Sequence, residues 1–410
     1  MKEIIEALYP MNRNLVSKGF DDALDWIDKL IGLKITSIPS GTKLGSWTVP
    51  DEWMIRDGWL KKDGEKILNY KTDPLAIASY SKPVKRKISF KQLDRHVTTN
   101  KEMPDATPYN FLFYVDEWGL CMPYNKRKEL KRGEYEVFID SEFKKGEMKY
   151  GVHTIPGKSD REILLFAHLD HPHQANDNLS GVACLIGMVK KFKCEHTIKL
   201  VFCAETIGSL AYAHKEDLSK VDAMIAVDMC GNEKETLLQF AWDFDCNFNR
   251  AAKCAVQAQG KPFRLGKFRN VIGSDEYAFN DPQLGIPGIM FSTYPYPEYH
   301  TSADTPDKIN YDKIQEIQEI ILKTIEISEK DFIPKRECVG QLMRSAYNVQ
   351  APMKESNMVQ DYFWYSIDGK RSVSNLCSEF DLPYNSVYDL LTKVEKDGFI
   401  SRVDTGEVGQ

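Results

Sequence analysis

A short segment near the middle of the chain concentrates residues that bind metals. The stretch LLFAHLDHPHQANDNLSG spans residues 164–181 and holds three of the eight histidines of the chain. Its histidines and aspartates are His168, His171, His173, Asp170 and Asp177. Zinc in hydrolytic sites is held by imidazole nitrogens and carboxylate oxygens that converge on one point. Taken alone, the segment predicts either an ordinary polar loop or one part of a metal site, and it favours neither.

Further along the chain, four segments place acidic residues or a histidine near the ends of apolar runs. Glu205 follows KLVFCA, and Asp228 follows MIAV. The segments GSDEYAF and PEYHTSADTPDKIN come next, and the second contains His300. Simple structural roles exist for some of them: a helix dipole favours a glutamate at its start, and an N-cap followed by proline explains Asp304-Thr305-Pro306 at the start of a helix. An N-cap does not explain His300, so a metal-binding role stays open.

The elements that carry these residues are typical of a mostly parallel sheet. After Gly157, the near-continuous apolar runs ILLFAH, TIKLVFCA and MIAVDM alternate with helical stretches such as SGVACLIGMVKKF. Such runs indicate strands that helices cover on both faces. In open α/β sheets, ligands bind at the carboxyl ends of the strands. His168, Glu205 and Asp228 fall at such ends, so we expect them to meet at one edge of the sheet.

Changes in sequence pattern divide the chain into parts. Residues 1–33 are helical by their apolar spacing, and the α/β pattern occupies residues 150–334. Residues 34–149 contain short β-type runs, such as FLFYV, between turns and predict a β-rich module. In residues 335–410, the predicted order of helices, turn and final strand is that of a winged helix. Four tryptophans of the module could line a substrate cleft, although filling the module's own core is the simpler role: Trp47, Trp53, Trp59 and Trp118.

The composition limits the classes of function. Hydrophobic residues make up 42% of the chain and charged residues 28%, which is ordinary for a globular protein with large packed cores. The net charge of −6 argues against a dominant surface for nucleic acid or anionic membranes. No apolar segment has the length of a signal peptide or a membrane span, and the nine cysteines form no CxxC pair. We therefore expect a cytoplasmic protein with reduced thiols and no membrane contact.

In their order along the chain, the polar motifs resemble those of the co-catalytic di-zinc aminopeptidases, a family that includes glutamate carboxypeptidase and glutaminyl cyclase. The order is His-x-Asp, Asp-Asn, Glu-x-x-Gly, Asp, Ser-Asp and His-x-x-x-Asp-Thr, and it occurs here between residues 168 and 308. The whole chain is similar to bacterial aminopeptidase-like proteins, some of them linked to polysaccharide biosynthesis. The resemblance implies that residues 1–33 and 150–334 form one zinc aminopeptidase-like catalytic domain, with residues 34–149 inserted and a C-terminal winged helix.

The resemblance implies roles for four metal ligands. Asp177 matches the carboxylate that bridges two zinc ions. His168 and Asp228 match the other ligands of one ion, and His300 matches a ligand of the second ion. A bridging carboxylate suits such sites because their two ions lie roughly 3.5–4 Å apart. We expect one or two zinc ions as the cofactor.

Further residues match positions that act in catalysis or shape the site. Glu205 matches the general base, which takes a proton from the attacking water and passes it to the leaving amine. Asp170 matches the aspartate that orients His168 and fixes its tautomer. Asn178 follows the bridging aspartate, where the family has a strained and often cis peptide bond. These matches imply hydrolysis of an N-terminal peptide bond, or of a related amide on a small peptide- or sugar-derived substrate.

One departure from the family pattern weakens the second metal position. The family has Glu-Glu where this chain has Glu205-Thr206, and a neutral hydroxyl is a poor substitute for a ligating carboxylate. The family's Ser-Asp-His is Ser274-Asp275-Glu276 in this chain. Candidates for a replacement ligand are the nearby side chains His171, His173 and Glu298. Each of them is also explained as a solvated loop side chain.

The alternative is a protein that has kept the fold, has little or no activity, and acts through its C-terminal part. Thr206 favours this alternative, and the retained Glu205 argues against it. Between residues 340 and 410, seven Lys and Arg stand against ten Asp and Glu, so we do not expect nucleic acid to bind there. The partner expected for the winged helix is another protein or a second copy of the chain.

Overall fold

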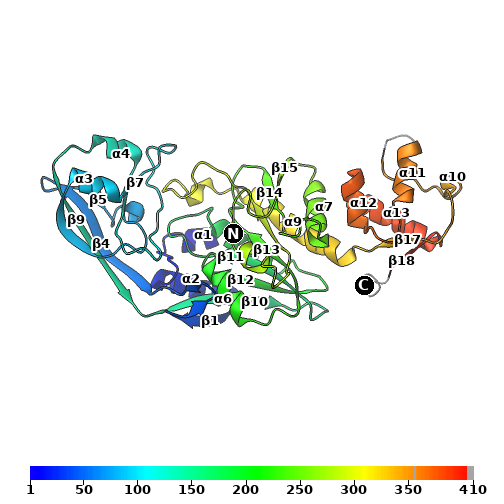
Figure 1. The fold of residues 1–410 in the computed structure, drawn as a ribbon, viewed down its shortest axis with the longest axis horizontal. Coiled ribbons are helices and arrows are strands. Elements are labelled where there is room, and N and C mark those ends of the chain that lie inside the picture. Colours follow the sequence, from blue (N-terminus) through cyan, green and yellow to red (C-terminus); the bar gives the residue numbers. More distant parts are fainter. Residues whose placement is uncertain (354–356, 404–410) are drawn as a thin grey trace.

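A large mixed sheet forms the centre of the computed structural model, which describes residues 1–353 and 357–403 (Figure 1). The strand order is β1-β10-β12-β11-β13-β16-β14-β15. The bounds are β1 (Lys34–Pro39), β10 (Glu147–Ile155), β11 (Glu162–His168), β12 (Thr197–Cys203), β13 (Val221–Val227), β14 (Thr236–Gln239), β15 (Phe263–Gly266) and β16 (Gly288–Ser292). The four middle strands, β12, β11, β13 and β16, are parallel to one another. Antiparallel strands flank them on both sides, β10 beside β12 and β14 beside β16. The α/β fold with a large mixed sheet is as predicted.

The order of the middle strands places helices on both faces of the sheet. The chain crosses from β11 to β12 in one direction and from β12 to β13 in the other. Because parallel crossovers are right-handed, the intervening helices α5 and α6 cover opposite faces. α5 packs with α1 and α9, α9 packs with α7, and α6 packs with α8. The bounds are α1 (Lys2–Leu8), α2 (Lys18–Ile31), α5 (Leu179–Met188), α6 (Ile207–Lys215), α7 (Asn247–Gln257), α8 (Glu276–Phe279), α9 (Tyr311–Lys330) and the 3-10 helix η3 (Pro306–Lys308).

Strand β11 runs through the middle of the hydrophobic core. Every residue of this strand after Glu162 is buried, which explains its continuous apolar sequence. The ring of Phe166 packs against Tyr212 of α6, with centroids 5.3 Å apart, and against Phe279 of α8, with centroids 5.1 Å apart. This packing holds the end of β11, where His168 lies, in one position.

A separate sheet is formed by the segment between β1 and β10, on the left of Figure 1. Its four strands have the order β5-β4-β9-β6, and its core includes Leu60, Trp118 and Tyr135. The segment contains β2 (Lys43–Leu44), β3 (Trp47–Thr48), β4 (Glu52–Lys62), β5 (Glu65–Asn69), β6 (Val84–Ser89), β7 (Val97–Thr98), β8 (Leu120–Cys121), β9 (Glu134–Lys144), α3 (Phe90–Leu93), α4 (Tyr124–Glu129), η1 (Pro74–Ala76) and η2 (Asp94–His96). Residues 34–39 and 147–149, which lie in the range predicted for the β-rich module, pair within the central sheet as parts of β1 and β10.

The C-terminal part adds helices and a two-stranded sheet. Its elements are β17 (Pro334–Arg336), α10 (Arg344–Tyr347), α11 (Asn357–Tyr365), α12 (Val373–Phe380), α13 (Tyr384–Lys396) and β18 (Ile400–Arg402). β17 pairs antiparallel with β18, and α12 packs against α7. The buried side chains of this part belong to the same hydrophobic core as those of the central sheet. Residues 404–410 of the predicted C-terminal part lie outside the described residues.

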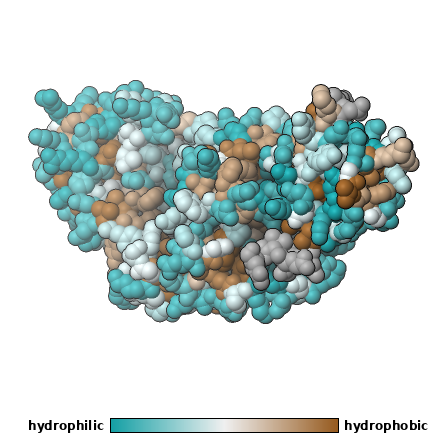
Figure 2. Space-filling model, turned by 45° about the vertical axis from the view of Figure 1, so that its right-hand side comes forward, coloured by the Kyte–Doolittle hydropathy of each residue, from teal (hydrophilic) through white to brown (hydrophobic). Residues whose placement is uncertain are grey.

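The molecular surface seen in Figure 2 is mostly polar, and the cysteines are unpaired. In the view of Figure 2, most of the surface is hydrophilic, with separate hydrophobic areas between. Within the described residues, no helix combines the length and the apolar character needed to cross a membrane. All nine cysteines lie in the described part of the chain and are free thiols, as expected from their scattered positions.

Candidate metal centre

Three strand ends bring predicted site residues together. His168 is the last residue of β11, Asp228 directly follows β13, and Glu205 lies two residues beyond β12. β11 lies between β12 and β13, and His168 pairs in register with Cys203 at the end of β12. The three side chains therefore emerge at the same carboxyl edge of the sheet, where ligands bind in this type of fold.

His168 is surrounded by three carboxylates. Its Nε2 lies 3.2 Å from Asp177 Oδ1 and 3.2 Å from Asp228 Oδ1, and its Nδ1 lies 3.4 Å from Asp170 Oδ1. All four side chains are buried. Burial by itself lowers the pKa of His168, but the facing carboxylates, first among them Asp228, raise it well above its usual value. Negative charge is therefore concentrated around this imidazole.

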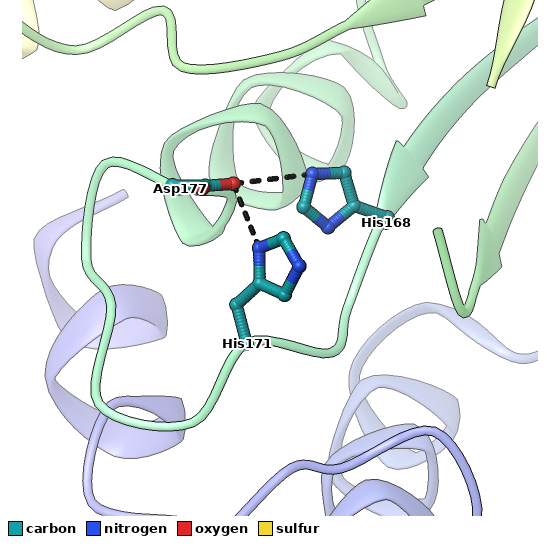
Figure 3. Close-up of side chains that lie close together, drawn as sticks. All are labelled: His168, His171 and Asp177. Atoms are coloured by element: carbon teal, nitrogen blue, oxygen red, sulfur yellow. Dashed lines mark hydrogen bonds and ion pairs between the residues drawn. The ribbon is translucent and has the colours of Figure 1, made fainter. Parts of the chain in front are cut away.

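Asp177 has imidazoles at both of its carboxylate oxygens. Besides the contact with His168, Oδ1 lies 3.0 Å from His171 Nδ1, and Oδ2 lies 2.9 Å from His300 Nε2. Figure 3 shows His168 from the strand end and His171 from the following loop converging on Asp177. Burial raises the pKa of Asp177, but the three imidazoles, His171 first, lower it well below its usual value. The peptide bond between Asp177 and Asn178 is cis.

Glu205 joins the cluster from the loop after β12. Its Oε2 lies 3.3 Å from His171 Nε2, and its main-chain N–H donates a hydrogen bond to Asp170 Oδ1 at 2.8 Å. The Glu205 side chain is 27% exposed, whereas the three aspartates of the cluster are almost completely buried. Glu205 is thus the most accessible carboxylate of the cluster, which suits a group that exchanges protons with a substrate.

The donor atoms are spaced as they are around a metal ion. Two groups of described residues have donor atoms within 4.8 Å of one another: His168 with His171 and Asp177, and His168 with Glu205 and Asp228. Neighbouring donors around a tetrahedral zinc lie about 3.3 Å apart, because the bonds are about 2.0–2.1 Å long. Among the described residues, buried Asp177 Oδ2 and His300 Nε2 lie 2.9 Å apart but form no hydrogen bond of good geometry. Because buried polar atoms without well-formed hydrogen bonds are costly, the donor set fits a divalent cation such as zinc.

The structure separates the three candidates for a replacement ligand. His171 is in contact with both Asp177 and Glu205. The ring of His173 instead lies against Tyr9, with centroids 6.0 Å apart, and burial lowers its pKa to about 4. Glu298 forms an ion pair with Lys308 at 2.9 Å. Of these three, His171 is the one that the fold brings into the cluster.

A buried arginine holds the loop that follows β11, residues 169–178, here called the metal loop. The Arg13 side chain is fully buried, and its guanidinium donates to four carbonyl oxygens of the loop. These carbonyls belong to Leu169, Asp170, His171 and Gln174. Burial lowers the pKa of Arg13 to about 10, which leaves the group charged at neutral pH. The loop needs such support because His171 and His173 both have positive φ, 72° and 56°.

Asp304 supports the bridging aspartate instead of capping a helix. Its Oδ1 accepts a hydrogen bond from the Asn176 N–H at 2.7 Å, and its Oδ2 accepts from the Asp177 N–H at 3.1 Å and from the Tyr296 hydroxyl at 2.9 Å. The N-cap of η3 is Thr305, whose side chain makes no capping hydrogen bond. The predicted N-cap followed by Pro is present, with Thr305 as the cap and Pro306 after it, whereas both oxygens of Asp304 bind a loop that is distant in sequence.

The segment around Glu276 lies beside the site and is occupied with other contacts. Asp275 Oδ1 accepts a hydrogen bond from the Thr206 N–H at 3.0 Å. Glu276 is fully buried and accepts from the Ser274 N–H at 2.9 Å and from Gln239 Nε2 at 3.3 Å. Burial raises the pKa of Glu276 to about 8. These bonds explain why a glutamate is accommodated where the family pattern has a histidine.

The segment between β1 and β10 reaches the metal centre through one short stretch. Pro108 and Thr301 form an antiparallel bridge, and the Tyr109 N–H donates to the carbonyl oxygen of His300 at 2.8 Å. The Tyr109 ring lies 5.3 Å from the ring of His171 and 5.2 Å from that of His300, centroid to centroid. Two histidines of the cluster are thus covered by a residue from a different part of the chain, which no local pattern indicated.

Phe111 extends this contact toward solvent. Its side chain is 40% exposed, its ring stacks on Phe113 with centroids 4.6 Å apart, and its ring lies 6.5 Å from that of His300. The run FLFYV, predicted as a strand, is irregular instead, with Tyr114 at a φ of 61°. The four tryptophans pack against aromatic rings outside the histidine cluster: Trp47 against Tyr114, Trp53 against Tyr80, Trp59 against Phe138 and Trp118 against His96. From the segment between β1 and β10, the aromatic side chains that lie beside the histidines of the site are therefore Tyr109 and Phe111.

Comparison with known proteins assigns the chain to a family. Residues 2–331 match a family described as a domain of unknown function, DUF4910. The chain belongs to this family. It is also 31% identical over 417 aligned residues, 96% of this chain and 94% of the other, to a Clostridium acetobutylicum protein whose name provisionally assigns it to polysaccharide biosynthesis and gives it an aminopeptidase-like domain.

Solved structures share the fold. A crystal structure of a protein provisionally named as a peptidase, from Clostridium acetobutylicum, has a TM-score of 0.81 and 27% identity, and the match covers 98% of this chain and 96% of the other. A zinc aminopeptidase from Bacillus subtilis has a TM-score of 0.59 and 16% identity over 79% of this chain and 92% of the other. A peptidase M28 precursor from Shewanella amazonensis has a TM-score of 0.57 and 16% identity, covering 80% and 92%. The fold is therefore aminopeptidase-like.

Replacing Arg13 tests the support of the metal loop. We expect Arg13→Met to lower the free energy of unfolding by about 3 kcal/mol, because four buried carbonyls lose a charged donor. Thermal unfolding and zinc titration of the same samples measure the effect on stability and on metal affinity. The matched control is Arg56→Met, which removes exposed ion pairs with Asp140 and Glu142 and should leave the melting temperature close to that of wild type. Equal melting temperatures of the two variants would contradict the assigned role.

Proposed function

We propose that the protein is a metal-dependent hydrolase of the aminopeptidase type that cleaves an amide bond with activated water. The observation that carries the proposal is Asp177, whose two oxygens face His168 and His300, with Glu205 more accessible beside them. One carboxylate shared between two histidines is the arrangement that a pair of co-catalytic ions needs. The aminopeptidase-like fold of the relatives supports the same function.

Four residues would hold zinc. His168 and Asp228 would bind one ion together with Asp177, and Asp177 and His300 would provide part of a second position. Asp170, at 3.4 Å from His168 Nδ1, would fix the tautomer in which Nε2 is free to bind. When bound, zinc supplies a nucleophilic water at neutral pH and polarises the amide carbonyl.

Glu205 would move the proton. Its carboxylate reaches solvent at the edge of the cluster, and its main chain is tied to Asp170 at 2.8 Å. A carboxylate held in this way takes the proton of the attacking water and releases it to the nitrogen of the leaving amine. The substrate would be a peptide or a small amide-bearing molecule. Because the name of the Clostridium relative mentions polysaccharide biosynthesis, amides of amino sugars are also candidate substrates.

The segment that carries Phe111 would form one wall of the substrate site. Phe111 is exposed, and its ring lies edge-on to that of His300. The ring of Tyr299 also stacks on His300, with centroids 4.0 Å apart. Aromatic rings of this kind bind apolar side chains by burying their surface. We therefore propose that residues 34–149 act as an inserted module that selects substrates with an apolar residue next to the cleaved bond.

The C-terminal part would act as a winged helix that binds protein rather than nucleic acid. Lys393 of α13 donates to the carbonyls of Tyr347 and Asn348, and Arg402 pairs with Glu395 at 3.0 Å, so these cations are engaged within the fold. Phosphate contacts need available cations. On α11, large side chains are exposed instead: Met358, Tyr362 and Tyr365. These favour a protein partner or a second copy of the chain.

Replacing the proposed base is the direct test of hydrolysis. We expect Glu205→Gln to lower kcat on aminoacyl amides, dipeptides and N-acylated amino sugars by roughly 10²- to 10⁴-fold, since the amide cannot accept the proton. The measurement is a rate assay on zinc-loaded protein, with bound zinc determined in parallel and expected to be unchanged. Glu129→Gln, on the exposed surface of α4, is the control and should keep full activity.

Two results would decide against this function. Equal rates for Glu205→Gln and Glu129→Gln would refute the base. A zinc-loaded wild-type protein without activity on the whole panel would favour the alternative, in which the fold serves as a scaffold and Thr206 marks the loss of catalysis.

Removing metal tests the zinc site without any substrate. We expect a chelator to lower the melting temperature by at least about 5 °C and zinc to restore it, because an ion bound to the folded state stabilises it by about 4 kcal/mol at 1,000 times its Kd. Differential scanning fluorimetry with and without zinc gives the shift. Asp177→Asn removes the shared ligand, so its melting temperature should not respond to zinc. A wild-type protein that also fails to respond would rule out the proposed centre.

Shortening Phe111 tests the substrate wall. We expect Phe111→Ala to lower kcat/KM about tenfold for substrates with a large apolar residue, and to leave kcat/KM for alanine amide within about twofold, since a small side chain does not reach the ring. The control is Tyr362→Ala, which removes an exposed aromatic side chain from α11, and its kcat/KM values should equal those of wild type. An equal loss on large and small substrates would contradict a role in selection.

A further inference from the structure

The second metal position lacks a ligand in the sequence pattern. Asp177 and His300 provide two donors, 2.9 Å apart, and Thr206 occupies the place of the family's third. The main chain of Thr206 has a φ of 60°, and its N–H is bound to Asp275. A hydroxyl is a weak donor for zinc, which takes four ligands and prefers imidazole, thiolate or carboxylate. A second ion would therefore need a donor from elsewhere in the fold.

His171 lies between the two predicted metal positions. Its ring centroid is 4.7 Å from that of His168 and 5.1 Å from that of His300. Its side chain is 4% exposed, so it is not the solvated loop residue that a polar loop would contain. Its two ring nitrogens face two different carboxylates: Nδ1 is 3.0 Å from Asp177 Oδ1, the oxygen that His168 also faces, and Nε2 is 3.3 Å from Glu205 Oε2.

We infer that His171 replaces the ligand missing at Thr206, binding the second ion through Nδ1, and that its Nε2–H donates to Glu205. The inference rests on the proposed metal-dependent function. Histidines that bind metals generally donate their other ring N–H to a carboxylate or carbonyl, which fixes the tautomer. In this chain the accepting carboxylate is the proposed base itself, so one residue both completes the metal position and orients the proton acceptor.

Other groups near the site are already committed. His173 lies against Tyr9, and Glu298 pairs with Lys308. Glu276 accepts hydrogen bonds from the Ser274 N–H and from Gln239 Nε2. His171 is held in place from two sides. Arg13 donates to its carbonyl oxygen at 2.9 Å, and the Tyr109 ring packs against its imidazole. The backbone at His171, with a φ of 72°, is strained for a residue with a side chain, and this support maintains it.

Counting bound zinc separates this inference from the general proposal. Protein dialysed against zinc and then against metal-free buffer is measured by elemental analysis, and cobalt-loaded samples are compared by visible absorption. We expect two equivalents for wild type, one for His171→Phe, which keeps a ring in the space, and two for the control His173→Phe. We also expect two equivalents for the double variant His171→Ala/Thr206→Glu and one for His171→Ala alone, because the restored carboxylate would serve the same ion.

Each result has one meaning. Two equivalents in both His171→Phe and His171→Ala, or one equivalent in the double variant, would overturn the inference while leaving the metal centre intact. One equivalent in wild type would do the same, because no second position would exist. No zinc in wild type would instead refute the proposed function itself. Circular dichroism and melting temperature identify a variant that has unfolded. If one of the two single variants at His171 is unfolded, the zinc content of the other single variant and of the double variant tests the inference.

Discussion

The structure depends on burying the carboxylate of Asp177 with both oxygens against imidazoles. A buried carboxylate is costly unless positive groups or hydrogen-bond donors compensate the lost hydration. Here His168, His171 and His300 do so and hold the pKa of Asp177 well below its usual value. Among the described residues, Asp177 Oδ2 and His300 Nε2 lie 2.9 Å apart without a hydrogen bond of good geometry between them. A cation at this point would satisfy both atoms.

The surrounding scaffold keeps these groups from separating. Asp304 binds the two amides around Asp177, and Asn178 ties the start of α5 to the end of β13 through Val227 O at 2.8 Å and the Met229 N–H at 3.1 Å. Arg13 donates hydrogen bonds to four carbonyl oxygens between residues 169 and 174 of the metal loop. The buried charged side chains of Asp304 and Arg13 thus hold the backbone of the residues that carry the charges and imidazoles of the cluster. Such networks are stable only when nearly every member has a partner.

His300 connects this cluster with the segment between β1 and β10. It faces Asp177 with its imidazole and accepts a hydrogen bond from Tyr109 with its carbonyl oxygen. A displacement of this segment would therefore change the metal centre as well as the cleft beside it. The contact explains how residues with a separate hydrophobic core contribute to a site built on another sheet.

Local sequence determined the strand ends and little of what surrounds them. His168, Glu205 and Asp228 were predictable neighbours because apolar runs indicate parallel strands, and the carboxyl ends of parallel strands share one edge. The tertiary structure decided which of two histidines in one loop joins them. His171 and His173 are two residues apart and both have positive φ, yet the side chain of His171 contacts Asp177 and that of His173 lies against Tyr9. Arg13, Tyr109 and Asp304 act across 60 residues or more, and no periodic pattern records such contacts, because they depend on how distant elements pack.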